Sequence, residues 1–188
     1  NVGKGAMGQI ARTAPKVRML HLCGFNGIAL SQLPLLAAGL EELTLTLCTE
    51  AGATLEANCF PRLRSLKLEA CRDVSAEGLR QVATESRDLR SLCLDSCALG
   101  GAVLAFARNL PVMNGNLEPF SCDQYLTDES LRAFSRACPR IESVSLKSVA
   151  TSVMIKQLGM HAENLRHLQL SGGEKLAGSI LPWKDADV

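Results

Sequence analysis

Aromatic side chains are scarce in this sequence of 188 residues: 4% are Phe, Tyr or Trp, with one Trp and one Tyr. A core built around a few large rings is therefore excluded, and many aliphatic side chains must fill the interior. The sequence also lacks an apolar run of the roughly 18 residues that would cross a bilayer. An excess of one charge is absent too, because 20 basic and 19 acidic residues leave a net charge of +1. Bulk charge thus gives no argument for nucleic-acid or membrane binding.

The sequence has eight cysteines, but their spacing is not that of a disulfide framework or of a metal site. Such a number would normally indicate a disulfide framework or a metal site. Instead, Cys48, Cys71 and Cys97 recur at intervals of 23 and 26 residues, each after the same local pattern. We interpret them as one buried position of a structural repeat, where weak S–H donors meet backbone carbonyls. The composition, 47% apolar and 21% charged, predicts a soluble intracellular protein in the reducing cytoplasm.

The same period governs the apolar residues. Three segments share the pattern L-x-x-L-x-L-x-x-C, and four looser copies keep its frame. The seven units begin at Val17, Leu40, Leu63, Leu89, Leu117, Ile141 and Leu165. Their spacings of 23 to 28 residues fall within the range of leucine-rich repeats.

Each unit is predicted to be a strand followed by a helix. The L-x-L core alternates with period 2, so its leucines lie on one face of a strand and the intervening residues on the other. Apolar residues at helical spacing come next, and Ser75 and Thr127 are suitable N-caps for two of these helices. The predicted helical stripes are Leu79, Val82, Ala83 and Ser86 in the third unit, Leu131, Phe134 and Cys138 in the fifth, and Met154, Leu158 and His161 in the sixth.

No single unit can bury both its strand face and its helix stripe, so the units must stack. The sequence thus predicts an α/β fold, a leucine-rich-repeat solenoid shaped as a curved horseshoe with parallel strands on the concave face and helices on the convex face. About seven units are expected over residues 17–173. Residues 1–16 are expected to form a flexible or capping segment, and residues 174–188 a C-terminal capping tail.

The segment Cys138-Pro139-Arg140-Ile141 places a cysteine just before the start of a unit. With the ninth-position cysteines and the apolar helix stripe, it makes residues 17–173 resemble the cysteine-containing subfamily of leucine-rich repeats. That subfamily is known mostly from F-box proteins, in which the solenoid holds the substrate of a ubiquitin ligase. The resemblance implies a non-catalytic protein-protein interaction module with a protein partner on its concave face. The alternative is a structural subunit of a large cytoskeletal, axonemal or mitochondrial assembly.

The exposed face of the predicted sheet is mostly small and polar, with one row of like charges. Glu69, Asp95 and Asp123 occupy the same position in three adjacent units, which stacking places about 5 Å apart. Lys67 and Lys147 flank this row. Such a row could receive an Arg or Lys of a partner. Charges at these positions are also common on a sheet face that they simply keep soluble, and both interpretations stay open.

Other motifs do not indicate chemistry. Gly3-x-Gly5-x-x-Gly8 matches the dinucleotide-binding fingerprint, but it lacks the preceding strand and the later ribose-binding acid. Cys93 and Cys97 are predicted on opposite strand faces and cannot share a metal. Three histidines fall in different units, which gives no catalytic triad: His21, His161 and His167. We therefore expect no enzyme activity, no cofactor, no metal and no nucleic-acid partner.

Overall fold

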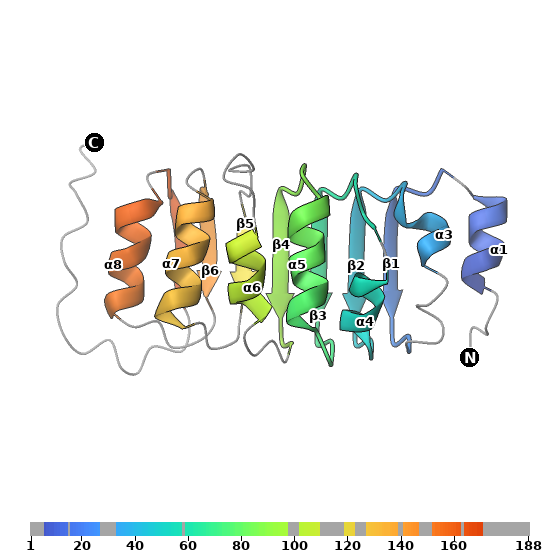
Figure 1. The fold of residues 1–188 in the computed structure, drawn as a ribbon, viewed down its shortest axis with the longest axis horizontal. Coiled ribbons are helices and arrows are strands. Elements are labelled where there is room, and N and C mark those ends of the chain that lie inside the picture. Colours follow the sequence, from blue (N-terminus) through green and yellow to red (C-terminus); the bar gives the residue numbers. More distant parts are fainter. Residues whose placement is uncertain are drawn as a thin grey trace.

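The fold is that of a single layered stack, seen in a computed structural model. The structure describes residues 6–14, 16–26, 33–57, 59–97, 102–109, 119–122, 127–138, 141–146, 152–162 and 164–170. Seven parallel strands form one open sheet in chain order, and the helices lie along one of its faces as a second layer (Figure 1). This α/β arrangement is compatible with a solenoid-like stack of repeats.

Each strand begins two residues after the predicted start of its unit. The strands are β1 (Met19–Cys23), β2 (Glu42–Thr46), β3 (Ser65–Glu69), β4 (Ser91–Asp95), β5 (Pro119–Cys122), β6 (Ser143–Leu146) and β7 (His167–Leu170). Equivalent residues of neighbouring units pair directly, so that Leu43 lies opposite Leu66 and Leu66 opposite Leu92. The predicted stack of parallel strands is confirmed. Each unit contributes one strand, and equivalent positions of neighbouring units pair in register.

Helices in the described part of the chain lie before β1 and between successive strands. They are α1 (Ala6–Thr13), α3 (Pro34–Ala37), α4 (Ala51–Glu56), α5 (Ala76–Glu85), α6 (Ala102–Asn109), α7 (Asp128–Ala137) and α8 (Ser152–His161). Both predicted N-caps are confirmed: Ser75 Oγ accepts a hydrogen bond from Gly78 N at 2.9 Å, and Thr127 Oγ1 accepts one from Ser130 N at 3.1 Å. Helices α3 and α4 have only 4 and 6 residues, shorter than the repeat pattern alone indicates.

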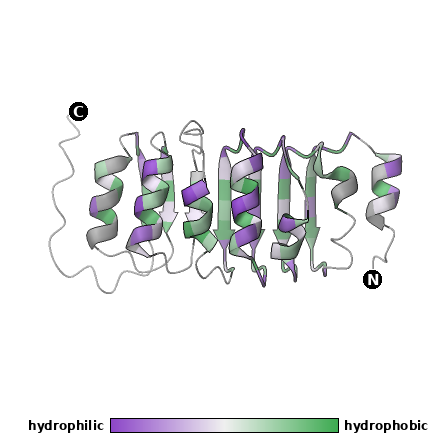
Figure 2. Cartoon of the chain, viewed as in Figure 1, coloured by the Kyte–Doolittle hydropathy of each residue, from purple (hydrophilic) through white to green (hydrophobic). Residues whose placement is uncertain are grey.

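Strand and helix side chains share one apolar core. Leu43, Leu66 and Leu92 are each at most 1% exposed. Phe120 continues their row on β5 and packs against Phe134 of α7, with ring centroids 4.1 Å apart. In Figure 2 the strands are mostly green, the colour of apolar residues, while α5 carries purple hydrophilic residues on the side away from the sheet. The sheet therefore buries one face under the helices.

Cysteines at the ninth position of a unit are buried, as predicted. Cys48, Cys71 and Cys97 are at most 1% exposed, and no disulfide joins the described cysteines. Cys71 Sγ donates to Leu45 O at 3.2 Å, and Cys97 Sγ to Asp95 O at 3.3 Å. Each thiol thus adds a second donor to a carbonyl near the end of a strand; Asp95 O, for example, also accepts from Ala70 N at 2.8 Å.

Candidate functional site

The open sheet face, meaning the face of the sheet opposite the helices, carries the predicted site. Leucines of β3 and β4 are buried, and the residues between and beside them are partly exposed. These partly exposed residues are Ser65, Lys67, Glu69, Ser91, Cys93 and Asp95. The predicted assignment of the two strand faces is confirmed, because a residue period of two turns alternate side chains to opposite sides.

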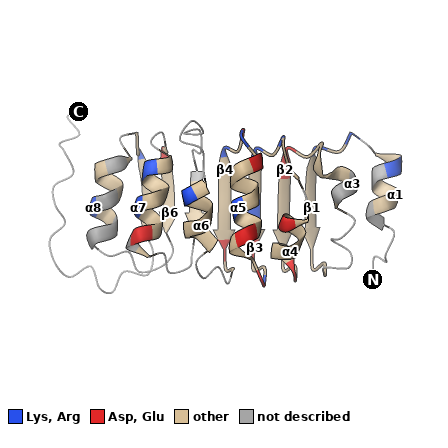
Figure 3. Cartoon of the chain, viewed as in Figure 1, with Lys and Arg blue, Asp and Glu red and all other residues tan. Residues whose placement is uncertain are grey.

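Two members of the predicted acidic row lie side by side. Glu69 ends β3 and Asp95 ends β4, and the two are direct register partners on strands that are about 4.8 Å apart. Asp123 and Lys147 lie outside the described residues. Figure 3 shows acidic residues at the ends where β3 and β4 finish. Helices follow these ends, and their positive N-termini also favour acidic neighbours, so the location alone does not require a partner.

Lys67 contacts the row directly and does more than flank it. Its Nζ lies 3.1 Å from Glu69 Oε2 on the same strand. The hydrogen bond and charge of Glu69 raise the pKa of Lys67, with smaller contributions from Cys93 and Asp95. Glu69 is therefore paired with a cation of its own strand.

Asp95 is held by a neighbouring strand. Its Oδ1 accepts a hydrogen bond from Ser121 Oγ of β5 at 2.9 Å. Cys93 lies between Lys67 and Ser121 in the register. Burial, followed by the charge of Asp95 and a hydrogen bond with it, raises the pKa of the Cys93 thiol from 9.0 to about 11, so the thiol stays neutral at physiological pH.

These five residues, Lys67, Glu69, Cys93, Asp95 and Ser121, form the open-face polar cluster. It carries two carboxylates against one ammonium group, a net charge of −1. Hydrogen bonds within the cluster fix the carboxylates, so a cationic side chain of a partner meets a preorganised acceptor. Glu69, Asp95 and Lys67 were predicted as site residues. Cys93 and Ser121 were not, although both share the strand position of Lys67.

Three further findings on the described residues concern metal binding, membrane spanning and thiol reactivity. Among them, no group of three or more His, Cys, Asp or Glu side chains is placed to hold a metal ion. None of the helices in the described ranges is long and apolar enough to cross a membrane. Burial raises the pKa of the Cys138 thiol from 9.0 to about 12, which keeps this side chain in its weakly nucleophilic form.

A second group of charges lies at the edge where the strands begin. Arg18, Arg64 and Arg90 each occupy the residue just before a strand. The sequence analysis did not select them, although the second position of successive units gives the signal. No family model matches the chain, so both sites are assigned on their geometry.

Proposed function

We propose that this chain is a non-catalytic protein-binding module, and that its partner docks on the open sheet face around Glu69 and Asp95. The open-face polar cluster carries this proposal. It holds two carboxylates together with neighbours that orient them, on a face that helices of the described residues leave uncovered. A matching Arg or Lys of the partner would add a charge-assisted contact to these carboxylates.

We further propose that the fold is a leucine-rich-repeat horseshoe of the cysteine-containing type, with the open sheet face as its concave side. Support comes from the period of 23 to 28 residues and from the ninth-position thiols that bond to strand-end carbonyls. The resemblance to F-box proteins then favours a receptor that holds a protein substrate for a ubiquitin ligase.

A structural subunit of a large assembly is the second candidate. It would use the same open sheet face, but with a permanent neighbour in place of an exchanging substrate. A receptor would instead release its substrate, so partner stoichiometry separates the two candidates.

Affinity purification with quantitative mass spectrometry tests the proposal. The tagged wild type is compared with Glu69→Ala/Asp95→Ala and with the charge-matched control Glu77→Ala/Glu129→Ala, whose acids lie on helices α5 and α7. We expect the first variant to lose specific partners about tenfold, as removal of a charge-assisted contact would cause. The control should retain them, and both should melt as cooperatively as the wild type.

Equal recovery of every partner by the two variants would contradict docking on the open face. The recovered proteins then separate the candidates. A ubiquitin-ligase adaptor and cullin, together with substoichiometric substrates, support the receptor. A single partner at equal stoichiometry in each preparation supports the structural subunit.

A further inference from the structure

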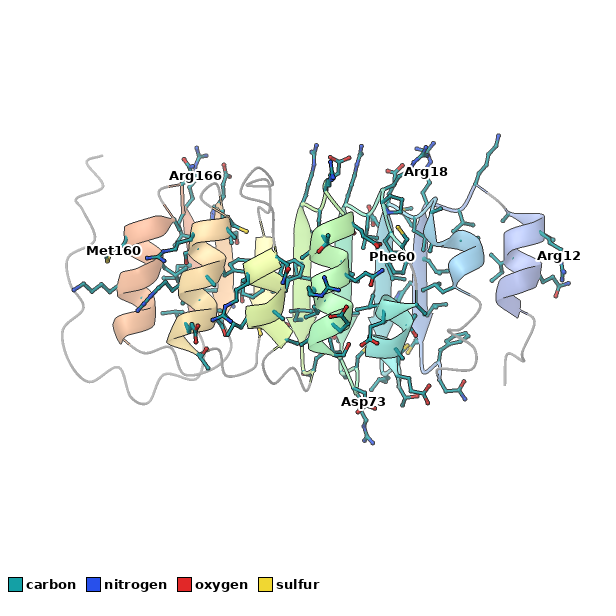
Figure 4. The ribbon with its side chains drawn as sticks, in the orientation of Figure 1. Arg12, Arg18, Phe60, Asp73, Met160 and Arg166 are labelled. Atoms are coloured by element: carbon teal, nitrogen blue, oxygen red, sulfur yellow. The ribbon has the colours of Figure 1, made fainter. Side chains whose placement is uncertain are left out.

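The edge of the sheet where the strands begin is rich in arginine. The residue just before a strand is Arg18 for β1, Glu41 for β2, Arg64 for β3 and Arg90 for β4. Strand spacing sets these positions about 4.8 Å apart along the edge. Figure 4 shows Arg18 and Arg166 at this edge, and Asp73 at the opposite one. The molecule therefore carries opposite charges at the two ends of its strands.

One carboxylate is shared by two guanidinium groups at this edge. Glu41 Oε1 lies 3.2 Å from Arg18 Nη1, and Glu41 Oε2 lies 3.7 Å from Arg64 Nη1. The Glu41 side chain is 26% exposed, whereas those of Arg18 and Arg64 are 71% and 54% exposed. Each guanidinium has five N–H donors in a planar fork, so both keep donors for a further acceptor.

A hollow of about 340 Å³ is lined by these three residues together with Arg62 and Asp88. Its size lies at the lower end of the range for ligand pockets. Within the described part of the chain, Arg62 makes no ion pair, and neither does Arg90. The hollow therefore has a guanidinium on its wall whose charge is not offset.

The backbone amides at the start of β2 and β3 are already used. Arg18 O accepts from both Glu41 N, at 2.7 Å, and Glu42 N, at 2.9 Å, and Glu41 O accepts from Arg64 N and Ser65 N at 2.7 and 3.0 Å. The amides of these two units thus bond to the unit before. An acceptor that binds beside β2 and β3 is therefore held by arginine side chains, whose planar fork suits the bidentate geometry of a carboxylate or a phosphate.

Helix dipoles do not account for these arginines. Helices α3, α4 and α5 run toward this edge, yet none carries a basic residue in its last turn. The dipole effect falls off beyond that turn. Including Arg87 and Arg90 in the loop before β4, the edge holds five arginines, against the acids Glu41 and Asp88 in the loops and Glu42 at the start of β2.

We propose that this arginine edge, from β1 to β4, is a second binding surface, which takes an extended acidic segment of a protein partner. A carboxylate of the segment sits in the hollow against Arg18, Arg62 and Arg64, and a second one reaches Arg90. Four strands span about 14 Å, the length of four to five extended residues. Along β3 the surface lies about 10 Å from Lys67, the nearest residue of the open-face polar cluster, and about 16 Å from Glu69, and it does not depend on the cluster.

Fluorescence anisotropy with a labelled decapeptide of alternating Glu and Gly tests this surface. We expect saturable binding that weakens as salt is raised, because exposed charges are screened. Arg62→Ala/Arg90→Ala should lower the affinity about tenfold. The matched control Arg132→Ala/Arg136→Ala removes two exposed arginines from α7 and should bind as the wild type does. Both variants should keep the wild-type melting temperature, since neither pair of side chains is buried.

Several results would overturn the proposal. An equal loss of peptide affinity in the two arginine variants would show that net charge alone attracts the peptide. Equal binding of a Gln-Gly decapeptide would remove the role of carboxylates, and tighter binding of an oligothymidylate would assign the edge to nucleic acid. Glu69→Ala/Asp95→Ala should bind the acidic peptide like the wild type, so failure here is distinguishable from failure of the open face.

Discussion

A residue in the left-handed backbone region follows each of the first four strands. Gly24, Leu47, Ala70 and Ser96 have φ values of 73°, 53°, 50° and 56°. Leu47 N then donates to Glu69 O and Ala70 N to Asp95 O, both at 2.8 Å. This bend turns the residue that follows toward the core, which is Phe25 in the first unit and a cysteine in the next three. A side chain in this conformation costs roughly 1 to 2 kcal/mol, a cost that glycine does not carry.

Leu47→Gly should therefore stabilise the protein. Glycine removes the strain of the left-handed conformation from the folded state, and it also gives the unfolded chain more entropy. The first effect on the free energy of unfolding is the larger one, and the net gain in stability expected is about 0.5 to 1 kcal/mol. Leu47 is 60% exposed, so little packing is lost. Urea unfolding followed by circular dichroism measures the change. Met160→Gly, at an exposed site within α8, should instead destabilise by about 1 kcal/mol. A loss of stability in Leu47→Gly would contradict the bend as the source of strain.

At the scale of elements, α4 lies so close to the loop before α5 of the next unit that only glycine fits. A Cβ on Gly52 would be 2.3 Å from Asp73 O and 2.5 Å from Ser75 N. Gly52 N also donates to Asp73 O at 3.0 Å. Gly78 of α5 is similarly close, because its Cβ would lie 2.8 Å from Gly52 O. Neighbouring units are thus held together by backbone contact as well as by the core.

Gly52→Ala should weaken the packing between these two units and destabilise the protein. The clash is with backbone atoms that cannot rotate away, so we expect a loss of about 2 to 3 kcal/mol. Gly39→Ala is the control, because its Cβ would meet nothing closer than 3.7 Å. Urea midpoints of the two variants measure the difference. A Gly52→Ala protein as stable as Gly39→Ala would disprove the close approach.

Buried thiols spread through the stack give the whole molecule a common response to alkaline pH. A hydrogen bond with Cys71 and burial raise the pKa of Cys48, and burial raises the pKa of Cys138 from 9.0 to about 12. The folded state thus prefers the neutral thiol, whereas the unfolded chain ionises it near pH 9. The stabilisation is complete below pH 9 and is lost as pH rises toward 12.

Unfolding free energy should consequently fall between pH 9 and 12, by about 1.4 kcal/mol per pH unit for each such thiol. Cys138→Ala removes one of these contributions. The unfolding free energy of this variant should therefore fall less steeply with pH than that of the wild type, by about 1.4 kcal/mol per pH unit. Urea unfolding at a series of pH values, in the presence of a reductant, measures both slopes. Parallel slopes in the wild type and the variant would mean that Cys138 is not a buried neutral thiol.

The sequence by itself determined the strands, their faces and the caps. Leu66 and Leu92 are buried, while Lys67 and Cys93 are partly exposed, because burial of apolar surface is a large effect that imposes a period of two on each strand. The repeat length then fixed which residues of adjacent units become neighbours. The juxtaposition of Glu69 with Asp95 followed from that count alone.

Only the tertiary structure decided how charged and polar groups pair. Lys67 contacts Glu69, Ser121 donates to Asp95, and Glu41 takes two arginines. Exposed pairs of this kind contribute only about 0 to 1 kcal/mol, so the repeat puts these residues at matching positions without specifying which of them pair. Their geometry depends on side-chain rotamers and on the local bends between units, which exist only once the apolar core has brought the strands together.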